Sequence, residues 1–317
     1  MTARSIIAPL QTLLETRHGS VLPLPPTLVR LFGEFRMQKS RSGPRVFSNF
    51  VSTLDGVVSL RIKGHDGGGD ISGFSAQDRM VMGLLRATAD VVIVGGGSLE
   101  ADSGRMWTAE AICPELAADY RVLNRTLRGE RAPLRVVVSS SGRLDLSSPV
   151  FAARRAVEAD RQLGGPWGAG GGRDAGGASL LIVTTRAGAR QLSAVALPEG
   201  VAICAIGRGR GALAAPDILE AVGAVARAQR MPMGRVLVEG GPRLLAGFYA
   251  AQVVDEQFLT LAPQLAGREV GDGRISLVMG ELFAPKAPRW GTLAEVRRGG
   301  NHLFLRYFFK RGGTGGA

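Results

Sequence analysis

Cysteine and histidine are scarce in this sequence, which contains only two cysteines and three histidines in 317 residues. Cys113 and Cys204 lie far apart and form no Cys-x-x-Cys motif, so neither a disulfide framework nor a cysteine-based zinc site is expected. His18, His65 and His302 have no metal-ligand spacing to one another. We therefore expect no bound metal and no mechanism that needs several histidines.

Long apolar runs are absent as well. The sequence has no stretch of about 18 uninterrupted apolar residues, which argues against a membrane-spanning helix. Near the N-terminus Pro9 and Gln11 break the apolar stretch, and Glu15 follows soon after, so a signal peptide is not expected. These features predict a cytoplasmic protein that does not associate with membranes.

Aromatic residues make up only 6% of the chain, although the formal net charge is +12. The basic residues are scattered and do not alternate with aromatic residues, so a nucleic-acid groove is poorly supported. A charge of this size could steer a phosphorylated small molecule towards the protein. The positive charge could equally come from solvated arginines on the surface with no binding role.

Short runs rich in valine and isoleucine alternate with segments of helical periodicity. The runs predict buried strands at 46–51, 91–95, 134–140, 179–185, 201–206, 235–240 and 256–263. The helical segments are 75–89, 112–127, 187–196, 216–230 and 242–252. Buried strands joined by helices predict an α/β fold with a mostly parallel sheet flanked by helices. The segments 291–300 and 301–310 instead predict an antiparallel C-terminal hairpin.

Composition also divides the chain. Residues 1–43, with three prolines at 23–26 and one short helix-like stretch, are expected to form an N-terminal extension on the main domain. Residues 44–310 are expected to form that domain, with a glycine-rich surface loop inserted at 164–178. The tail 311–317 is expected to be disordered.

The strongest local feature is the segment 235–252. A hydrophobic strand ends at Glu239, turns through Gly240 and Gly241, and enters a helix at Pro242. Glycine allows close backbone approach, and the free amides of a helix N-terminus suit a pyrophosphate. Two interpretations stay open at this point, a cofactor site and an ordinary strand-to-helix turn.

Weaker features occur at three other places. The strand 91–95 runs into glycines and then Ser98 and Asp102, a pattern that suits a ribose or phosphate. Residues 47–56 end in a polar stretch that includes Asp55, which is either a group facing a cleft or part of a turn. Arg86 closes a predicted helix, where it could clamp a phosphate or interact with the helix C-terminus.

One glycine motif is set aside. The segment GRGRGA at 207–212 fits a loose dinucleotide-binding pattern, but such a fingerprint should run directly into a helix. Pro216 interrupts here, and Arg227 stands near the position where an acidic residue is expected. We predict a loop.

Taken in order, several segments resemble the reductase domain of the riboflavin-biosynthesis deaminase/reductase family. They are SNFVSTLDG, ISG, LLRATADVVIVGGGSLEAD, RVVVSSSGRL, VLVEGGPRLLAGF and VVDEQFLTLAPQLAG. Together they span residues 45–267, and the hairpin at 291–310 extends the likeness. The deaminase half is expected to be absent, because the chain has neither a His-x-Glu nor a Pro-Cys-x-x-Cys signature.

The resemblance implies a dihydrofolate-reductase-like fold, NADPH as cofactor and a homodimer. The family reaction reduces the ribosyl group of 5-amino-6-(5-phosphoribosylamino)uracil to a ribityl chain, so a small phosphorylated pyrimidine is the expected substrate. Hydride passes from nicotinamide C4 to the anomeric carbon, and the protein supplies orientation and electrostatics.

The resemblance also implies roles for individual residues. Glu239 and Asp55 are the catalytic candidates, and Asn49, Arg86 and Glu239 are expected to contact the substrate, with Arg86 at its phosphate. The expected cofactor contacts are Ser52 near the nicotinamide, Ser98, Asp102, Ser140 with Arg143 near the adenosine phosphate, and Gly240, Gly241, Pro242 and Arg243 around the pyrophosphate.

The sequence departs from the family pattern at two places, which leaves the substrate open. Ser139 stands where an aspartate is common, and Ser103 and Gly104 replace an acidic residue and a proline. One alternative is a dihydrofolate or pterin reductase of the same fold, with Asp78 as its acid. Another is a non-catalytic NADP-binding protein.

Overall fold

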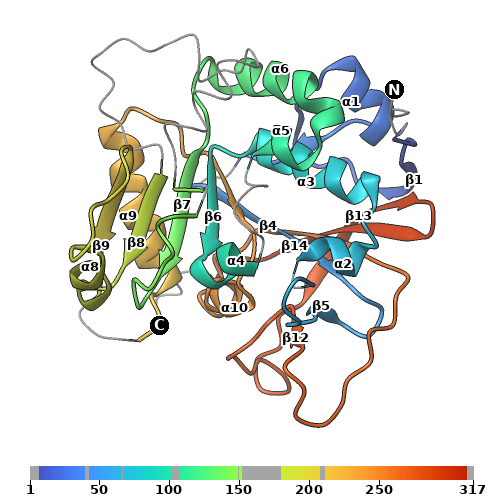
Figure 1. Cartoon of the computed structure of the whole chain (residues 1–317). Coiled ribbons are helices and arrows are strands. Elements are labelled where there is room, and N and C mark those ends of the chain that lie inside the picture. Colours follow the sequence, from blue (N-terminus) through green and yellow to red (C-terminus); the bar gives the residue numbers. More distant parts are fainter. Residues whose placement is uncertain are drawn as a thin grey trace.

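A ten-stranded mixed sheet forms the centre of the molecule in the computed structural model, which describes residues 7–39, 43–65, 67–101, 108–148, 150–151, 180–207 and 211–312. The strand order is β1-β13-β14-β11-β4-β10-β6-β7-β8-β9 (Figure 1). Its parallel part consists of β4 (Arg45–Ser52), β6 (Val91–Gly95), β7 (Leu134–Ser139), β8 (Leu180–Thr184), β9 (Val201–Ala205), β10 (Arg235–Val238) and β11 (Glu256–Leu261). The predicted strands and the mostly parallel α/β fold class are therefore confirmed.

Helices cover both faces of the parallel part, which explains why its strands are apolar on both sides. One face packs against α1 (Pro26–Phe32), α3 (Ala76–Thr88), α6 (Ala117–Arg128) and α8 (Arg186–Leu192). The other packs against α9 (Ala215–Ala228) and α10 (Pro242–Ala250). Shorter helices are α2 (Gly68–Ser72), α4 (Gly96–Ala101), α5 (Ala109–Ile112) and the 3-10 helix η1 (Pro114–Leu116). Within the described residues, no helix has both the length and the apolar character needed to cross a bilayer.

The other end of the sheet is antiparallel. The strands β13 (Gly291–Gly299) and β14 (His302–Phe309) form the antiparallel C-terminal hairpin that the sequence predicted, and β14 lies beside β11. From the N-terminal segment, β1 (Gln11–Glu15) adds a further antiparallel strand on β13, and α1 contributes Leu28, Leu31 and Phe32 to the core. Two small two-stranded sheets pair β2 (Ser20–Val21) with β3 (Arg36–Met37), and β5 (Val57–Ser59) with β12 (Ile275–Ser276).

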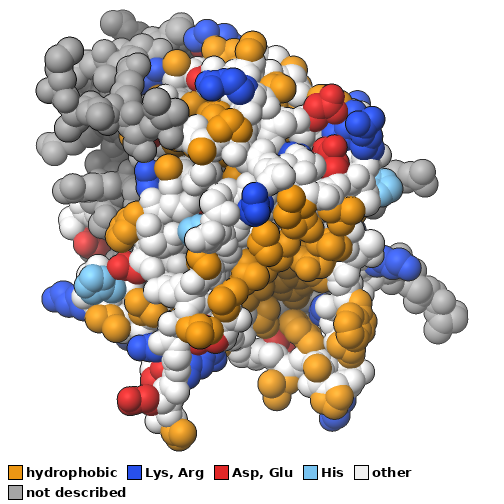
Figure 2. All heavy atoms as spheres, turned by 90° about the vertical axis from the view of Figure 1, so that its right-hand side faces the viewer, with side chains coloured by type: hydrophobic (Ala, Val, Ile, Leu, Met, Phe, Trp, Pro, Cys, Tyr) orange, Lys and Arg blue, Asp and Glu red, His pale blue; other side chains and the backbone are white. Residues whose placement is uncertain are grey.

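One face of the antiparallel part is apolar and only partly covered. Its apolar residues alternate along the strands and are half-buried or exposed: Leu259, Leu261, Leu293, Val296, Leu303, Leu305 and Tyr307. We call this set the apolar sheet face. The exposed Arg298 points to the same face opposite Leu303. Figure 2 shows hydrophobic side chains gathered over a hollow on this side of the molecule. Contiguous exposed apolar surface of this kind often marks an interface.

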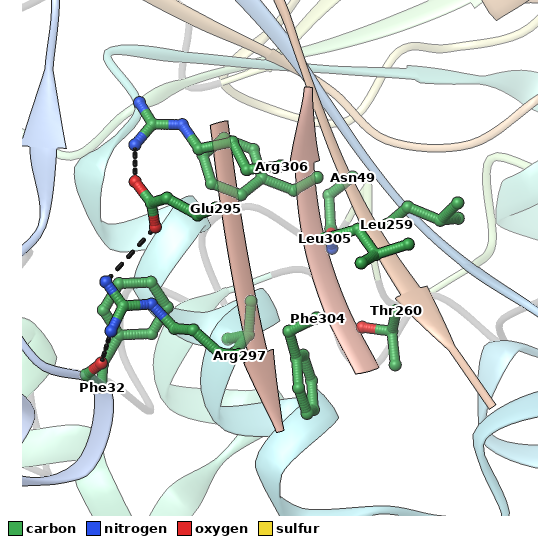
Figure 3. Close-up of a pocket in the computed structure, with 11 residues that line it drawn as sticks. Phe32, Asn49, Leu259, Thr260, Glu295, Arg297, Phe304, Leu305 and Arg306 are labelled. Carbon is green, nitrogen blue, oxygen red and sulfur yellow. Dashed lines mark hydrogen bonds and ion pairs between the residues drawn. The ribbon is translucent and has the colours of Figure 1, made fainter. Parts of the chain in front are cut away.

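The opposite face of the same strands carries buried charges. The Arg306 guanidinium donates from Nε to Glu256 at 2.8 Å, and it also pairs with Glu295 (Figure 3). Glu256 pairs in turn with Arg45 of β4 at 2.7 Å. Arg306, Glu256 and Glu295 are each at most 4% exposed, so water screens these pairs little. The charges therefore tie the hairpin to the first strand of the parallel sheet.

Arg297 extends this network to the N-terminal segment. Its Nη1 donates to Thr12 Oγ1 at 2.6 Å and to the Phe32 carbonyl at 2.7 Å, and its guanidinium lies over the Phe32 ring. Figure 3 shows the line of contacts from Arg306 through Glu295 and Arg297 to Phe32. The pocket drawn beside them has a volume of about 20 Å³, which suits about one water molecule and no substrate.

Asp55 holds together two segments that are far apart in sequence. Its carboxylate accepts hydrogen bonds from Thr53 Oγ1 at 2.6 Å and from the amides of Ala266 and Gly267 at 3.1 and 2.9 Å. These hydrogen bonds, that from Thr53 first, lower the pKa of Asp55 to about 2. The turn after β4 is thereby fixed to the start of the long segment that carries β12.

Replacing Arg306 with methionine will lower the free energy of unfolding by about 3–5 kcal/mol, because two buried carboxylates lose a partner. The matched control is Arg125→Met, which removes an exposed ion pair with Glu130 and should cost less than about 1 kcal/mol. Urea denaturation of the two variants and the parent measures the difference. Equal losses in both variants would show that the buried network does not stabilise the fold.

Asp55→Asn will lower Tm at pH 7, and the gap from the parent will shrink as the medium is acidified. The folded-state pKa of Asp55 is depressed, so its contribution is complete above the ordinary value of 3.8 and is lost as pH falls towards about 2. Thermal unfolding between pH 7 and pH 3 measures the gap, with the exposed Glu220→Gln as control. A gap that stays constant with pH would contradict this role.

Candidate active site

A cleft of about 1070 Å³ opens at the carboxyl ends of four neighbouring parallel strands. Its walls come from the ends of β4, β6, β7 and β10, which are adjacent in the sheet. In open α/β sheets, ligands bind outside the carboxyl ends of the strands. The cleft is therefore the candidate active site.

Most of the sequence-predicted site residues line this cleft together. They are Asn49, Arg86, Ser98, Ser140, Arg143, Glu239, Gly240, Gly241, Pro242 and Arg243. Of the other three, two described residues do not line it and the third is not described. Ser52 is buried and donates to the Thr53 carbonyl at 2.9 Å, Asp55 caps the turn described above, and Asp102 lies outside the described residues.

The polar centre of the cleft is an ion pair between Arg86 and Glu239. Arg86 Nε donates to a Glu239 carboxylate oxygen at 2.6 Å, and both residues are over nine-tenths buried. Arg86 closes α3, whereas Glu239 follows β10 and donates its amide to the Ile93 carbonyl of β6. Two groups that the sequence suggested as separate substrate contacts are therefore coupled by a charge-assisted hydrogen bond.

Glycine turns allow β6 and β10 to approach each other at the cleft. Gly240 and Gly241 have φ values of 82° and 78°, a region that side chains disfavour. A Cβ at Gly240 would lie 2.9 Å from Ser98 Oγ, and one at Gly241 would lie 3.5 Å from the Gly95 Cα. Helix α10 begins at the next residue, Pro242. The unpaired backbone N–H groups of its first turn therefore lie beside the two glycine turns.

Serines and an arginine form the far wall, beyond β7. Thr184 and Thr185 donate their hydroxyls to the carbonyls of Ser139 and Ser140, at 2.6 and 2.8 Å. These bonds hold the end of β7 in place while Ser139, Ser140 and Ser141 line the cleft. The guanidinium of Arg143 has no hydrogen bond or ion pair among the described residues. The wall thus presents hydroxyls and one positive charge.

The structure adds cleft residues that the sequence did not indicate. Val58, Ser59 and Arg61 come from β5 and the loop after it, and Ile275 and the stretch 279–281 come from the segment around β12. No local motif marks these residues, because the antiparallel pairing of β5 with β12 brings them to the cleft.

The glycine motif at 207–212 does not form the strand-to-helix turn of a dinucleotide-binding fingerprint. Its described part is in a loop between β9 and α9, as predicted, and residues 208–210 lie outside the described residues. Residues 211–213 nevertheless line the cleft.

Asp78, the acid of the pterin alternative, is in the first turn of α3 and is only 5% exposed. Burial raises the pKa of its carboxyl above the ordinary value, and hydrogen bonds with Thr260 and Ser72 oppose that rise. It is not among the residues that line the cleft. Across the described part of the chain, no group of three or more His, Cys, Asp or Glu residues is arranged to hold a metal ion.

Comparison with solved structures shows the same fold in several proteins. A pyrimidine reductase-like protein from Corynebacterium diphtheriae has a TM-score of 0.56 and 17% identity, covering 92% of this chain and 96% of that one. RibD of Acinetobacter baumannii has a TM-score of 0.53 and 17% identity, covering 86% of this chain. This chain spans only 59% of that RibD.

A deaminase and 5-amino-6-(5-phosphoribosylamino)uracil reductase from Thermotoga maritima has a TM-score of 0.52 and 18% identity, covering 84% of this chain and 57% of that one. A search of curated proteins finds no match. Residues 44–285, three quarters of the chain, match the family model described as the RibD C-terminal domain. This chain therefore belongs to the RibD C-terminal domain family.

Proposed function

We propose that this protein is an NADPH-dependent reductase that converts 5-amino-6-(5-phosphoribosylamino)uracil, or a closely related phosphorylated pyrimidine, to its ribitylamino product. One observation carries the proposal. A single cleft joins the glycine turns of β6 and β10 to the buried Arg86–Glu239 pair. Family membership and the reductase named for the Thermotoga structure support the reaction class.

The residues at one half of the cleft fit a dinucleotide cofactor. The bare backbone at 95–97 and 240–241 leaves room that side chains would fill, and the N-terminus of the nine-residue α10 favours phosphate. Arg243 at that N-terminus and Arg143 beyond β7 supply positive charge near the serine hydroxyls. When bound, NADPH supplies the hydride for the reduction. Ser98 and Ser140 are the proposed contacts for its ribose and phosphate groups.

The other half of the cleft is proposed to hold the substrate. The Glu239 carboxylate accepts hydrogen bonds from hydroxyl or ring N–H groups of the substrate, and Arg86 fixes the direction of that carboxylate. The side-chain amide of Asn49 has no hydrogen bond among the described residues, so it can bind a polar group of the substrate. Val51 and Met82 give this half apolar walls, which exclude water and strengthen the polar contacts.

We further propose that the protein acts in the cytoplasm as a homodimer. Cys113 and Cys204 are free thiols, which agrees with a reducing compartment. The apolar sheet face is the proposed contact between subunits, because a second copy would remove its leucines from water.

Glu239→Gln will lower kcat/KM for the pyrimidine by about 100-fold or more, because the neutral amide can neither pair with Arg86 nor accept as strong a hydrogen bond. NADPH oxidation, followed by absorbance, measures the rate with the pyrimidine and, in parallel, with dihydrofolate. The matched control Glu220→Gln, an exposed change on α9, should retain the parent rate.

Three outcomes of this assay would count against the proposal. Turnover of dihydrofolate in place of the pyrimidine would favour the pterin alternative, and NADPH binding without turnover of either would favour a binding protein. NADPH binding no tighter than NADH binding would contradict the cofactor assignment.

Leu293→Glu will convert the proposed dimer to a monomer, because a charge at this 37% exposed position would be buried at the interface. Sedimentation velocity of the parent and the variant measures the state. Val195→Glu, an equal change after α8, is the control and should leave the dimer intact. A monomeric parent would refute the dimer.

A further inference from the structure

The cleft has more positive than negative side chains, and one of its arginines is already engaged. Its charged residues are Arg61, Arg86, Arg143, Arg243, Glu239 and Glu281. Arg86 donates to Glu239 at 2.6 Å, so that charge is offset by a buried carboxylate. The guanidinium groups of Arg61, Arg143 and Arg243 have no hydrogen bond or ion pair among the described residues. These three charges are available to an anionic ligand.

The sheet order separates Arg61 from the other two. Arg143 follows β7 and Arg243 is in the first turn of α10, beside the serines and glycine turns of the proposed cofactor half. Arg61 follows β5, the strand that continues from β4, and it lines the cleft together with Val58 and Ser59. Three strand spacings separate β4 from β7, about 14 Å. Arg61 therefore enters the cleft from the segment that follows β4, and Arg143 enters it from the segment that follows β7.

Arg61 is exposed at the cleft, and its backbone conformation is unusual. Arg61 has a φ of 53°, a left-handed value that is uncommon for a residue other than glycine and that gathers at ligand sites. Ser59 Oγ accepts from the Arg61 amide at 3.3 Å and supports the turn. A Cβ added at Gly273 would lie 3.9 Å from Cβ and Cδ of Arg61, so the arginine stem runs along that backbone.

We propose that Arg61 binds the terminal phosphate of the substrate, a phosphorylated sugar chain carried by a heterocycle. This inference rests on the proposed function and adds a specificity-determining residue to it. The guanidinium offers forked N–H donors that match two phosphate oxygens, and no carboxylate among the described residues is paired with them. Arg86 then orients the Glu239 carboxylate, which binds the sugar or the heterocycle of the same substrate. The phosphate is bound by Arg61 instead of by Arg86. A substrate without the phosphate gains nothing from Arg61.

Steady-state kinetics with the phosphorylated pyrimidine and its dephosphorylated counterpart test the assignment. Arg61→Gln should raise KM for the phosphorylated compound about 10- to 100-fold, leave its kcat within about twofold, and leave KM for the dephosphorylated compound unchanged. Arg61→Lys should show a smaller rise, because it keeps the charge and loses the fork. The matched control Lys63→Gln removes one charge from the same loop and should match the parent for both compounds. Equal effects of Arg61→Gln on the two compounds would overturn the assignment.

A binding measurement separates failure of this inference from failure of the proposed function. Ribose 5-phosphate is titrated calorimetrically into the parent, Arg61→Gln and Lys63→Gln, with NADPH affinity measured in the same samples. Weaker binding of ribose 5-phosphate in Arg61→Gln alone, with NADPH affinity unchanged, supports the phosphate site even when the pyrimidine is not reduced. Absence of binding to the parent, or equal binding to all three proteins, overturns it.

Discussion

The carboxylate of Glu256 stands where the parallel and antiparallel parts of the sheet meet, and the architecture depends on it. One of its oxygens accepts from Arg45 on β4, and the other accepts from Arg306 on β14. Glu256 is fully buried, so an unpaired charge at this point would be costly. The two arginines neutralise this buried charge, and they hold β4 in place between β11 and β10. The position of β4 decides where its far end, with Asn49, meets the cleft.

A second buried ion pair, Arg86 with Glu239, joins distant elements at the other end of the strands. It connects the end of a helix on one face of the sheet to the end of a central strand. Both pairs connect elements that are remote in sequence, with a sequence separation of 153 between Arg86 and Glu239. The first pair positions the sheet, and the second positions the polar group on which the proposed chemistry depends. Beside this second pair, glycine turns leave backbone bare where a phosphate of the proposed cofactor would lie.

Much of the site could be found in the sequence because it follows a rule about strand ends. Val- and Ile-rich runs mark the parallel strands, and whatever follows each run lies at the same edge of the sheet. Ser98 and Glu239 were identified in this way, whereas Ser140 was expected only from the family resemblance, and all three line the cleft. Asp55 shows where the rule is ambiguous, since a carboxylate after a strand serves equally well as a ligand contact or as a turn cap. Its hydrogen bonds to Ala266 and Gly267 put it in the turn.

The sequence by itself determined most element types, the parallel direction of strands joined by helices, the C-terminal hairpin and the glycine turns at the cleft. These depend on periodicity and on local backbone preferences, which a short segment carries on its own. Only the tertiary structure decided that Arg86 faces Glu239, that β1 extends the sheet beside β13, and that β5 and β12 bring Arg61 to the cleft. Each of these is a contact between segments far apart in the chain, and such contacts are chosen by packing of the whole core. No window of sequence contains both partners, and so no local pattern could predict them.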